Sequence, residues 1–141
     1  MSSLEKRAWL MLCSMCPVYA VYFVIQSAFP ALLPTMLDHI RCFAIVAGIH
    51  AVLYLGGLLQ IKRHESGDAM QEDERDVAID RRASRTAYFV LVTGMLLVGV
   101  VMPFNRQGWQ ITNPALLAIV LSETARYTLI IVNYRRPRLG H

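Results

Sequence analysis

The chain has 141 residues, of which 55% are hydrophobic and only 17% are charged. Soluble domains carry about 25% charged residues, so this composition excludes an ordinary soluble domain and predicts one small membrane domain. The net charge is +4, and the three cysteines are an odd number that argues against a disulfide framework.

Four apolar stretches are long enough to cross a bilayer, which requires about 20 predominantly apolar residues. We predict spans at 8–29, 42–61, 86–104 and 115–134, within one domain that covers residues 1–141. The first stretch is preceded by charge, as in a signal peptide, but its apolar run is too long and it lacks a small-residue cleavage site. We therefore expect it to be retained. The predicted fold is all-α, an integral membrane four-helix bundle.

Lysine and arginine predict the orientation of this bundle. Eleven of the fourteen lie in the N-terminus, the 62–85 loop and the C-terminus, whereas the other two loops hold one each, Arg41 and Arg106. Cytoplasmic loops carry the excess of basic residues, so we expect both termini and the 62–85 loop in the cytoplasm, with the third helix extended into that loop. The basic charge follows from this topology, so we expect no nucleic-acid partner. The predicted location is the bacterial inner membrane, as a multi-pass protein.

Polar side chains recur at a similar depth in three of the predicted spans. They are Tyr19, Tyr22, His50, Tyr54, Glu123 and Arg126. Residues three apart on a helix, such as Glu123 and Arg126, can reach each other. An unpaired charge at mid-bilayer costs at least about 2.5–3.5 kcal/mol. We therefore expect these two charges to neutralise each other and to face His50 and the tyrosines.

This intramembrane polar cluster has two interpretations. It can be a structural clasp that holds four helices in register, which is the simpler one. It can also be a proton relay or a ligand site, because ionisable groups inside a membrane often mark a transport pathway. The sequence leaves both open.

The segment before the third span predicts a charged cytoplasmic helix. Its candidate interaction residues are Asp73, Glu74, Arg75, Asp76, Asp80 and Arg82. Apart from Arg75, which can pair with Glu72, they have no opposite charge three or four residues away. Their partners are expected elsewhere in the chain or on another chain, so this helix is a candidate docking surface. The alternative is a solvated helix start followed by basic membrane anchors.

Other motifs carry little chemistry. Cys13 and Cys16 form a C-x-x-C pair of the kind used in redox work, but they lie inside the first span and Cys42 lies at the opposite face. We expect all three to pack as small apolar groups. The four histidines are too scattered for a metal site, and phosphate-loop and nucleophile motifs are absent from the sequence. We predict no enzymatic activity, no cofactor and no bound metal.

The stretch "QEDERDVAIDRRASRTAYFVLVTGMLL" resembles the signature of small four-span bacterial inner-membrane proteins of unknown function, a DER(E/D)xxI…RAxxxAY pattern. The matching positions are Asp73–Asp76, Ile79, Arg82–Ala83 and Ala87–Tyr88. The beginning "EKRAWLML" and the end "LLAIVLSETARYTLIIVNYRR" are similar too, so the resemblance covers most of the chain. Members of this family are often encoded beside a small helix-turn-helix regulator, which implies a regulatory or stress-linked role.

These observations predict a non-enzymatic membrane accessory, sensor or regulatory protein that acts through its cytoplasmic charged helix. Its expected partners are the lipid bilayer and either a cytoplasmic protein or a second copy of the chain. The alternative is a small transporter or channel subunit that uses the Glu/Arg/His cluster. Small multidrug transporters have a similar size and four spans, but they carry a membrane glutamate in the first helix, where this chain has none.

Overall fold

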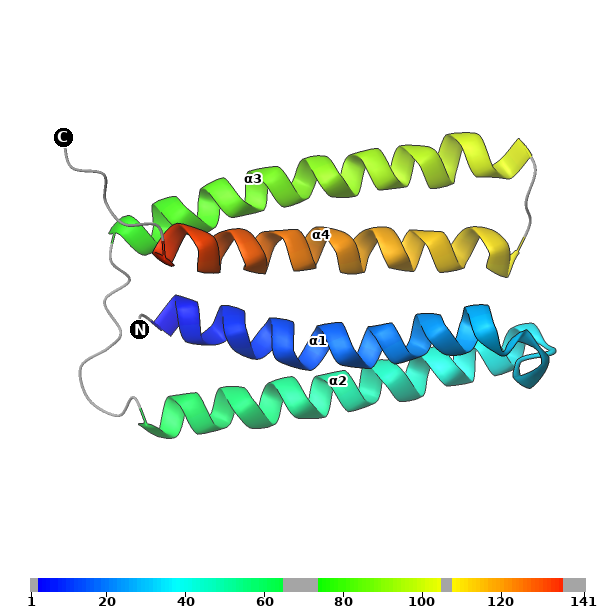
Figure 1. Ribbon diagram of the computed structural model, residues 1–141, viewed down its shortest axis with the longest axis horizontal. Helices are drawn as coiled ribbons and strands as arrows, with labels where there is room; N and C mark the ends of the chain where they lie inside the picture. The colour runs from blue at the N-terminus through cyan, green and yellow to red at the C-terminus, as the bar shows by residue number, and fades with distance from the viewer. Residues whose placement is uncertain (1–2, 65–73, 105–107, 136–141) are drawn as a thin grey trace.

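The structure, a computed structural model, describes residues 3–64, 74–104 and 108–135. In this part of the chain four long helices run antiparallel to their neighbours (Figure 1). They are α1 (Ser3–Ala28), α2 (Met36–His64), α3 (Glu74–Leu96) and α4 (Trp109–Arg135). The described residues thus contain four helices long and apolar enough to cross a membrane. The all-α prediction with four spanning helices is confirmed to that extent.

The third apolar helix continues beyond α3 through two irregular turns. A π-helical turn, η2 (Leu97–Val101), is followed by a 3₁₀ turn, η3 (Met102–Phe104). Pro103 explains the irregularity, because proline lacks an amide hydrogen and its ring crowds the carbonyl four residues earlier. The amide of Met102 instead donates to the carbonyl of Leu97, five residues back.

The connection between α1 and α2 is fixed by a proline and a reciprocal cap. Pro30 opens a short 3₁₀ turn, η1 (Pro30–Leu32). The Thr35 hydroxyl and amide donate to a carboxylate oxygen of Asp38 at 2.6 and 3.2 Å, and the Asp38 amide donates to the Thr35 hydroxyl oxygen at 3.3 Å. This is a capping box, which satisfies free amides at a helix start, so α2 begins at Met36.

The four helices stand in a row in the order α3, α4, α1, α2 (Figure 1). Helix α4 packs against α3 and α1, and α1 packs against α2; among the described residues, α2 and α3 make no extensive contact with each other. The outer faces of the row are apolar and exposed, with Val52 on α2 72% and Phe89 on α3 63% exposed. Apolar faces of this extent are unusual on soluble monomers and are typical of helices that meet lipid.

Small residues bring α3 and α4 close together. Ala83 and Ala87 of α3 and Ala118 of α4 are buried. A methyl group placed at Gly94 would lie 2.6 Å from the Cβ of Ala118. Close backbone approach over small residues is how helices pack in membranes, where lipid removes most of the hydrophobic driving force.

The core is densest at one end of the row, where α1 and α3 begin and α2 and α4 end (Figure 1). We call this the terminal end. The buried residues there are Ala8, Ala83, Ile130 and Ile131, flanked by Trp9, Tyr127 and Tyr134 among others. This cluster joins α1, α3 and α4, so the charged start of α3 is packed against two other helices.

We expect Gly94→Ala to lower the free energy of unfolding in detergent by about 1–3 kcal/mol, the usual cost of overpacking. The added methyl group meets the Cβ of Ala118, which cannot rotate away. Gly48→Ala is the matched control, because nothing lies within 4 Å of the added atom and alanine is the better helix former by about 1 kcal/mol. Denaturation followed by circular dichroism measures both; equal stability of the two variants would contradict this packing.

Candidate functional site

An ion pair joins α3 to α4 near the terminal end. The Nη2 atom of Arg126 donates to both carboxylate oxygens of Asp80, at 2.9 and 3.2 Å. The two side chains are 31% and 35% exposed, so the pair is partly desolvated. Charge-assisted hydrogen bonds of this kind are stronger than neutral ones.

Arg126 reaches Asp80 by extending toward the terminal end. The contact of Gly94 with Ala118 sets the register of the antiparallel pair, and it places the backbone of Arg126 level with Thr86. Asp80 lies six residues beyond that level, about 9 Å at 1.5 Å per residue. Long basic side chains extend in this way to bring their charge to a membrane surface. The guanidinium group therefore lies closer to the terminal end than the backbone of Arg126 does.

This pairing differs from the predicted pair of Glu123 and Arg126. In the part of the chain that the structure describes, no ion pair joins these two residues; the partner of Arg126 is Asp80. Glu123 is half-buried on α4, within electrostatic reach of Tyr127. Glu123 is also within electrostatic reach of Arg126, but the direct ion pair goes to Asp80, because a carboxylate on the neighbouring helix is within reach of the longer side chain.

Asp76 and Arg75 also face α4. The Tyr134 hydroxyl donates a hydrogen bond to Asp76, and the Arg75 guanidinium carbon lies 5.6 Å from the centre of the Tyr134 ring. On the other side of α4, the guanidinium carbon of Arg135 lies 5.1 Å from the centre of the Trp9 ring. Cation–π contacts of this kind are attractive, so the charged end of α3 is bound to α4, and α4 to α1, through polar contacts.

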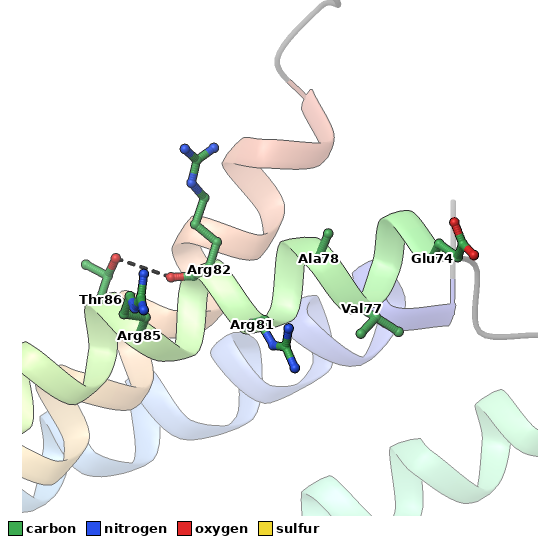
Figure 2. Close-up of a pocket in the computed structure, with 7 residues that line it drawn as sticks. All are labelled: Glu74, Val77, Ala78, Arg81, Arg82, Arg85 and Thr86. Atoms are coloured by element: carbon green, nitrogen blue, oxygen red, sulfur yellow. Dashed lines mark hydrogen bonds between the residues drawn. The ribbon is translucent and has the colours of Figure 1, made fainter.

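The opposite face of α3 carries a groove with charged walls (Figure 2). Its volume is about 950 Å³. The lining residues are Glu74, Val77, Ala78, Arg81, Arg82, Arg85 and Thr86. We call the four charged ones (Glu74, Arg81, Arg82, Arg85) the α3 outer face. Figure 2 shows Arg81 and Arg82 projecting to opposite sides, with Arg85 one turn further along.

The predicted interaction surface is therefore divided between two faces. Asp76, Asp80 and Arg75 contact α4, and their docking role stays a prediction. Glu74 and Arg82 line the groove.

Asp73 lies outside the described residues, and its role stays a prediction. Arg81 and Arg85 were not among the predicted interaction residues, although they line the groove. Their spacing of four residues was the signal, since it puts both on one helix face.

The intramembrane polar residues lie mainly between α1 and α2. The ring of His50 lies 5.5 Å from that of Tyr19 and 6.4 Å from that of Tyr54, centre to centre. Tyr54 in turn is within electrostatic reach of Tyr127 on α4. Tyr22 lies further from the terminal end, where its ring contacts Phe43 at 5.9 Å.

The structure thus brings His50, Tyr19 and Tyr54 together, as expected, while Arg126 points away. The His50 Nε2 atom is buried and has no hydrogen-bond partner among the described residues. Buried polar atoms of this kind are uncommon and call for an explanation, such as an ordered water or a ligand. Whether the cluster is structural or functional stays open to test.

A second polar contact lies at the far end of the row. His39 and Trp109 stack with ring centres 5.0 Å apart and planes 17° apart, and they tie the start of α2 to the start of α4. The sequence analysis missed this contact, because nothing local links positions 70 residues apart.

The cysteines and the acidic residues give no sign of redox or metal chemistry in the described structure. Cys13 is exposed, and the sulfur of Cys16 lies 3.9 Å from the Thr124 hydroxyl oxygen. The two point in different directions, so Cys13 departs from the expected small buried group. Among residues 3–64, 74–104 and 108–135, no three His, Cys, Asp or Glu side chains gather as metal ligands would.

Comparison with known proteins gives one informative result. Residues 18–138 match the family described as "Predicted membrane protein (DUF2178)". No curated protein and no solved structure matches the chain. The resemblance seen in the sequence is thereby confirmed as far as a predicted membrane protein family of unknown function; its motif and its neighbouring regulator stay predictions.

We expect Asp80→Asn and Arg126→Leu to show a coupling free energy of about 0.5–3 kcal/mol in a double-mutant cycle, as residues in contact do. Each single change leaves one partner of the pair without its counter-charge. The cycle of Glu123→Gln with Arg126→Leu is the control and should couple by at most about 0.5 kcal/mol, as charges three residues apart on an exposed helix do. Unfolding free energies in detergent measure both, and a larger coupling in the control would contradict the observed pairing.

Proposed function

We propose that the protein, which belongs to the family of predicted membrane proteins DUF2178, is a non-enzymatic membrane accessory, sensor or regulatory protein. It acts through the exposed start of α3, which carries Glu74, by contact with another protein. The supporting observation is the division of charge on α3. Asp76 and Asp80 are bound to α4, whereas Glu74 makes no ion pair or hydrogen bond among the described residues.

The α3 outer face has no internal partners among the described residues. Its four charged side chains make no ion pair or hydrogen bond there, and all four are exposed. Charged side chains presented on a helix that is itself firmly packed give a preformed contact surface, which costs less to order on binding than a flexible segment. Glu74, at the start of α3, lies farthest from the apolar part of the helix and is best placed for a soluble partner.

The proposal includes an orientation in the bacterial inner membrane, with both termini and the start of α3 in the cytoplasm. Its support is the distribution of lysine and arginine. Eleven lie in the N-terminus, the 62–85 loop and the C-terminus, whereas the other two loops hold one each. Near the terminal end, α1 carries Trp9 and α4 carries Tyr134. Tryptophan and tyrosine are enriched at membrane interfaces.

A small transporter or channel subunit is the second candidate. The supporting observation is the intramembrane row of Tyr19, His50 and Tyr54, together with a half-buried Glu123 that forms no ion pair among the described residues. It ranks second because Arg126, one of the predicted cluster's charged residues, extends toward the terminal end and pairs with Asp80. Proton flux into proteoliposomes that is lost in His50→Leu would put it first.

We expect reporter fusions after Gly67 and Gly140 to score cytoplasmic and a fusion after Gln107 to score periplasmic. Basic residues flanking the spans hold their loops on the cytoplasmic side. Alkaline phosphatase and green fluorescent protein fusions measure the two sides. A periplasmic signal from the fusion after Gly140 would overturn the proposed orientation.

We expect the charge reversal Asp73→Lys/Glu74→Lys to weaken co-purification of a partner protein from native membranes, more strongly at low salt than at high salt. Exposed ionic contacts are screened over about 8 Å at physiological ionic strength. Stability should fall only by the loss of the interaction with the helix dipole, about 0.3–1 kcal/mol per acidic residue, because Glu74 is exposed and makes no internal contact among the described residues.

Asp76→Asn is the matched control, since Asp76 is bound to Tyr134. It should lower stability and leave the partner contact of the folded protein intact. Co-purification that survives the double reversal unchanged would show that the start of α3 is only a solvated helix end.

A further inference from the structure

We propose that the arginines of the α3 outer face bind the phosphate headgroup of an anionic phospholipid, whose acyl chains lie along the exposed apolar face of α3. The groove lined by Arg81, Arg82 and Arg85 is the headgroup site. This goes beyond the proposed function and does not depend on it, because the lipid would bind whether or not a protein contacts the start of α3.

Charge is the first support. Arg81 and Arg85 are four residues apart, about 6 Å along the helix axis, and therefore lie on one face, while Arg82 lines the other side of the groove (Figure 2). Arginine presents several N–H donors in a planar fork that matches phosphate oxygens. Among the described residues these three guanidinium groups make no ion pair. Glu74 is the acidic residue of the groove, and it lies seven residues from Arg81, about 10 Å along the helix.

Depth is the second support. Ala83, between the arginines, belongs to the same buried cluster as Ala8, and Trp9 packs against that cluster. Tryptophan settles at the boundary between headgroups and hydrocarbon, so Trp9 marks the level at which a lipid phosphate lies. The arginines that flank Ala83 are thus at headgroup level.

The apolar face of α3 is the third support, and it favours a lipid over a free anion or a soluble protein. Phe89 follows Arg85 by four residues and Leu96 follows Phe89 by seven, so one helix face runs from the arginines into the membrane. Phe89 and Leu96 are 63% and 58% exposed. A headgroup held by the arginines would therefore place its chains beside exposed apolar side chains. Basic clusters next to a span bind anionic lipids through the same electrostatics.

The experiment uses the full chain in mild detergent, freed of endogenous lipid, with binding measured by native mass spectrometry. The probes are dihexanoyl phosphatidylglycerol, which is anionic, and dihexanoyl phosphatidylcholine, which has the same chains and no net charge. Inorganic phosphate is the third probe. We expect the anionic lipid to bind at least fivefold more tightly than the zwitterionic lipid. Inorganic phosphate should bind more weakly than the anionic lipid, because it has no acyl chains to contact the apolar face of α3.

The variant Arg81→Gln/Arg85→Gln should lower the ratio of anionic to zwitterionic lipid affinity at least fivefold. The control Arg7→Gln/Lys62→Gln removes two exposed positive charges from the same end of the row, outside the groove, and should change the ratio less than twofold. Because each ratio is measured within one variant, a change in stability does not imitate the effect. Phe89→Ser should weaken the anionic lipid without changing the affinity for inorganic phosphate.

Three results would overturn the inference. Equal binding of the two lipids would show that charge does not select the ligand. An equal fall of the affinity ratio in the control Arg7→Gln/Lys62→Gln would show that the net charge, and not the groove, selects the lipid. Inorganic phosphate that displaces the anionic lipid at equal concentration would show a site for free anions, without a role for the apolar face. The two proposals fail separately, because the lipid ratio is measured on the purified chain without a protein partner, whereas the partner contact is measured by co-purification from native membranes.

Discussion

The ion pair of Asp80 with Arg126 is the constraint on which the other features of α3 and α4 depend. A guanidinium group cannot lose its proton, so a chain that carries arginine inside a span must either supply a counter-charge or bring the charge to the surface. Here it does both. The side chain extends about 9 Å along the bundle and ends on a carboxylate of the neighbouring helix. The ion pair therefore holds the start of α3 against α4, in the register that the contact of Gly94 with Ala118 sets.

That position determines the division of charge around α3. Once Asp80 is turned toward α4, helix periodicity turns Asp76 the same way, and it accepts a hydrogen bond from Tyr134. Arg81, Arg82 and Arg85 fall on the remaining faces and line the groove. A segment with mixed charges becomes a helix with an acidic face bound to α4 and a basic face that makes no ion pair among the described residues. The division of charge is thus a consequence of internal packing.

The sequence predicts the parts of this structure that depend on local composition. Spans follow from apolar length, and the described residues contain four helices long and apolar enough to cross a membrane. The partner of Arg126 could not be predicted in the same way, because Asp80 is 46 residues away and helix periodicity relates only residues of one helix. The same holds for the stacking of His39 on Trp109. The need for glycine at position 94 also has no local signal, since it arises only from the close approach of Ala118 on α4.

The distribution of charge between the membrane interior and its surface also favours an accessory role over transport. A transport pathway needs ionisable groups that remain available within the membrane. Arg126 is committed to Asp80, which leaves Glu123 and His50 as the titratable groups of the predicted cluster. His50 contacts Tyr19 and Tyr54 on α1 and α2, whereas Glu123 lies on α4. On α3 at the terminal end, in contrast, Glu74, Arg81, Arg82 and Arg85 are exposed and make no ion pair among the described residues.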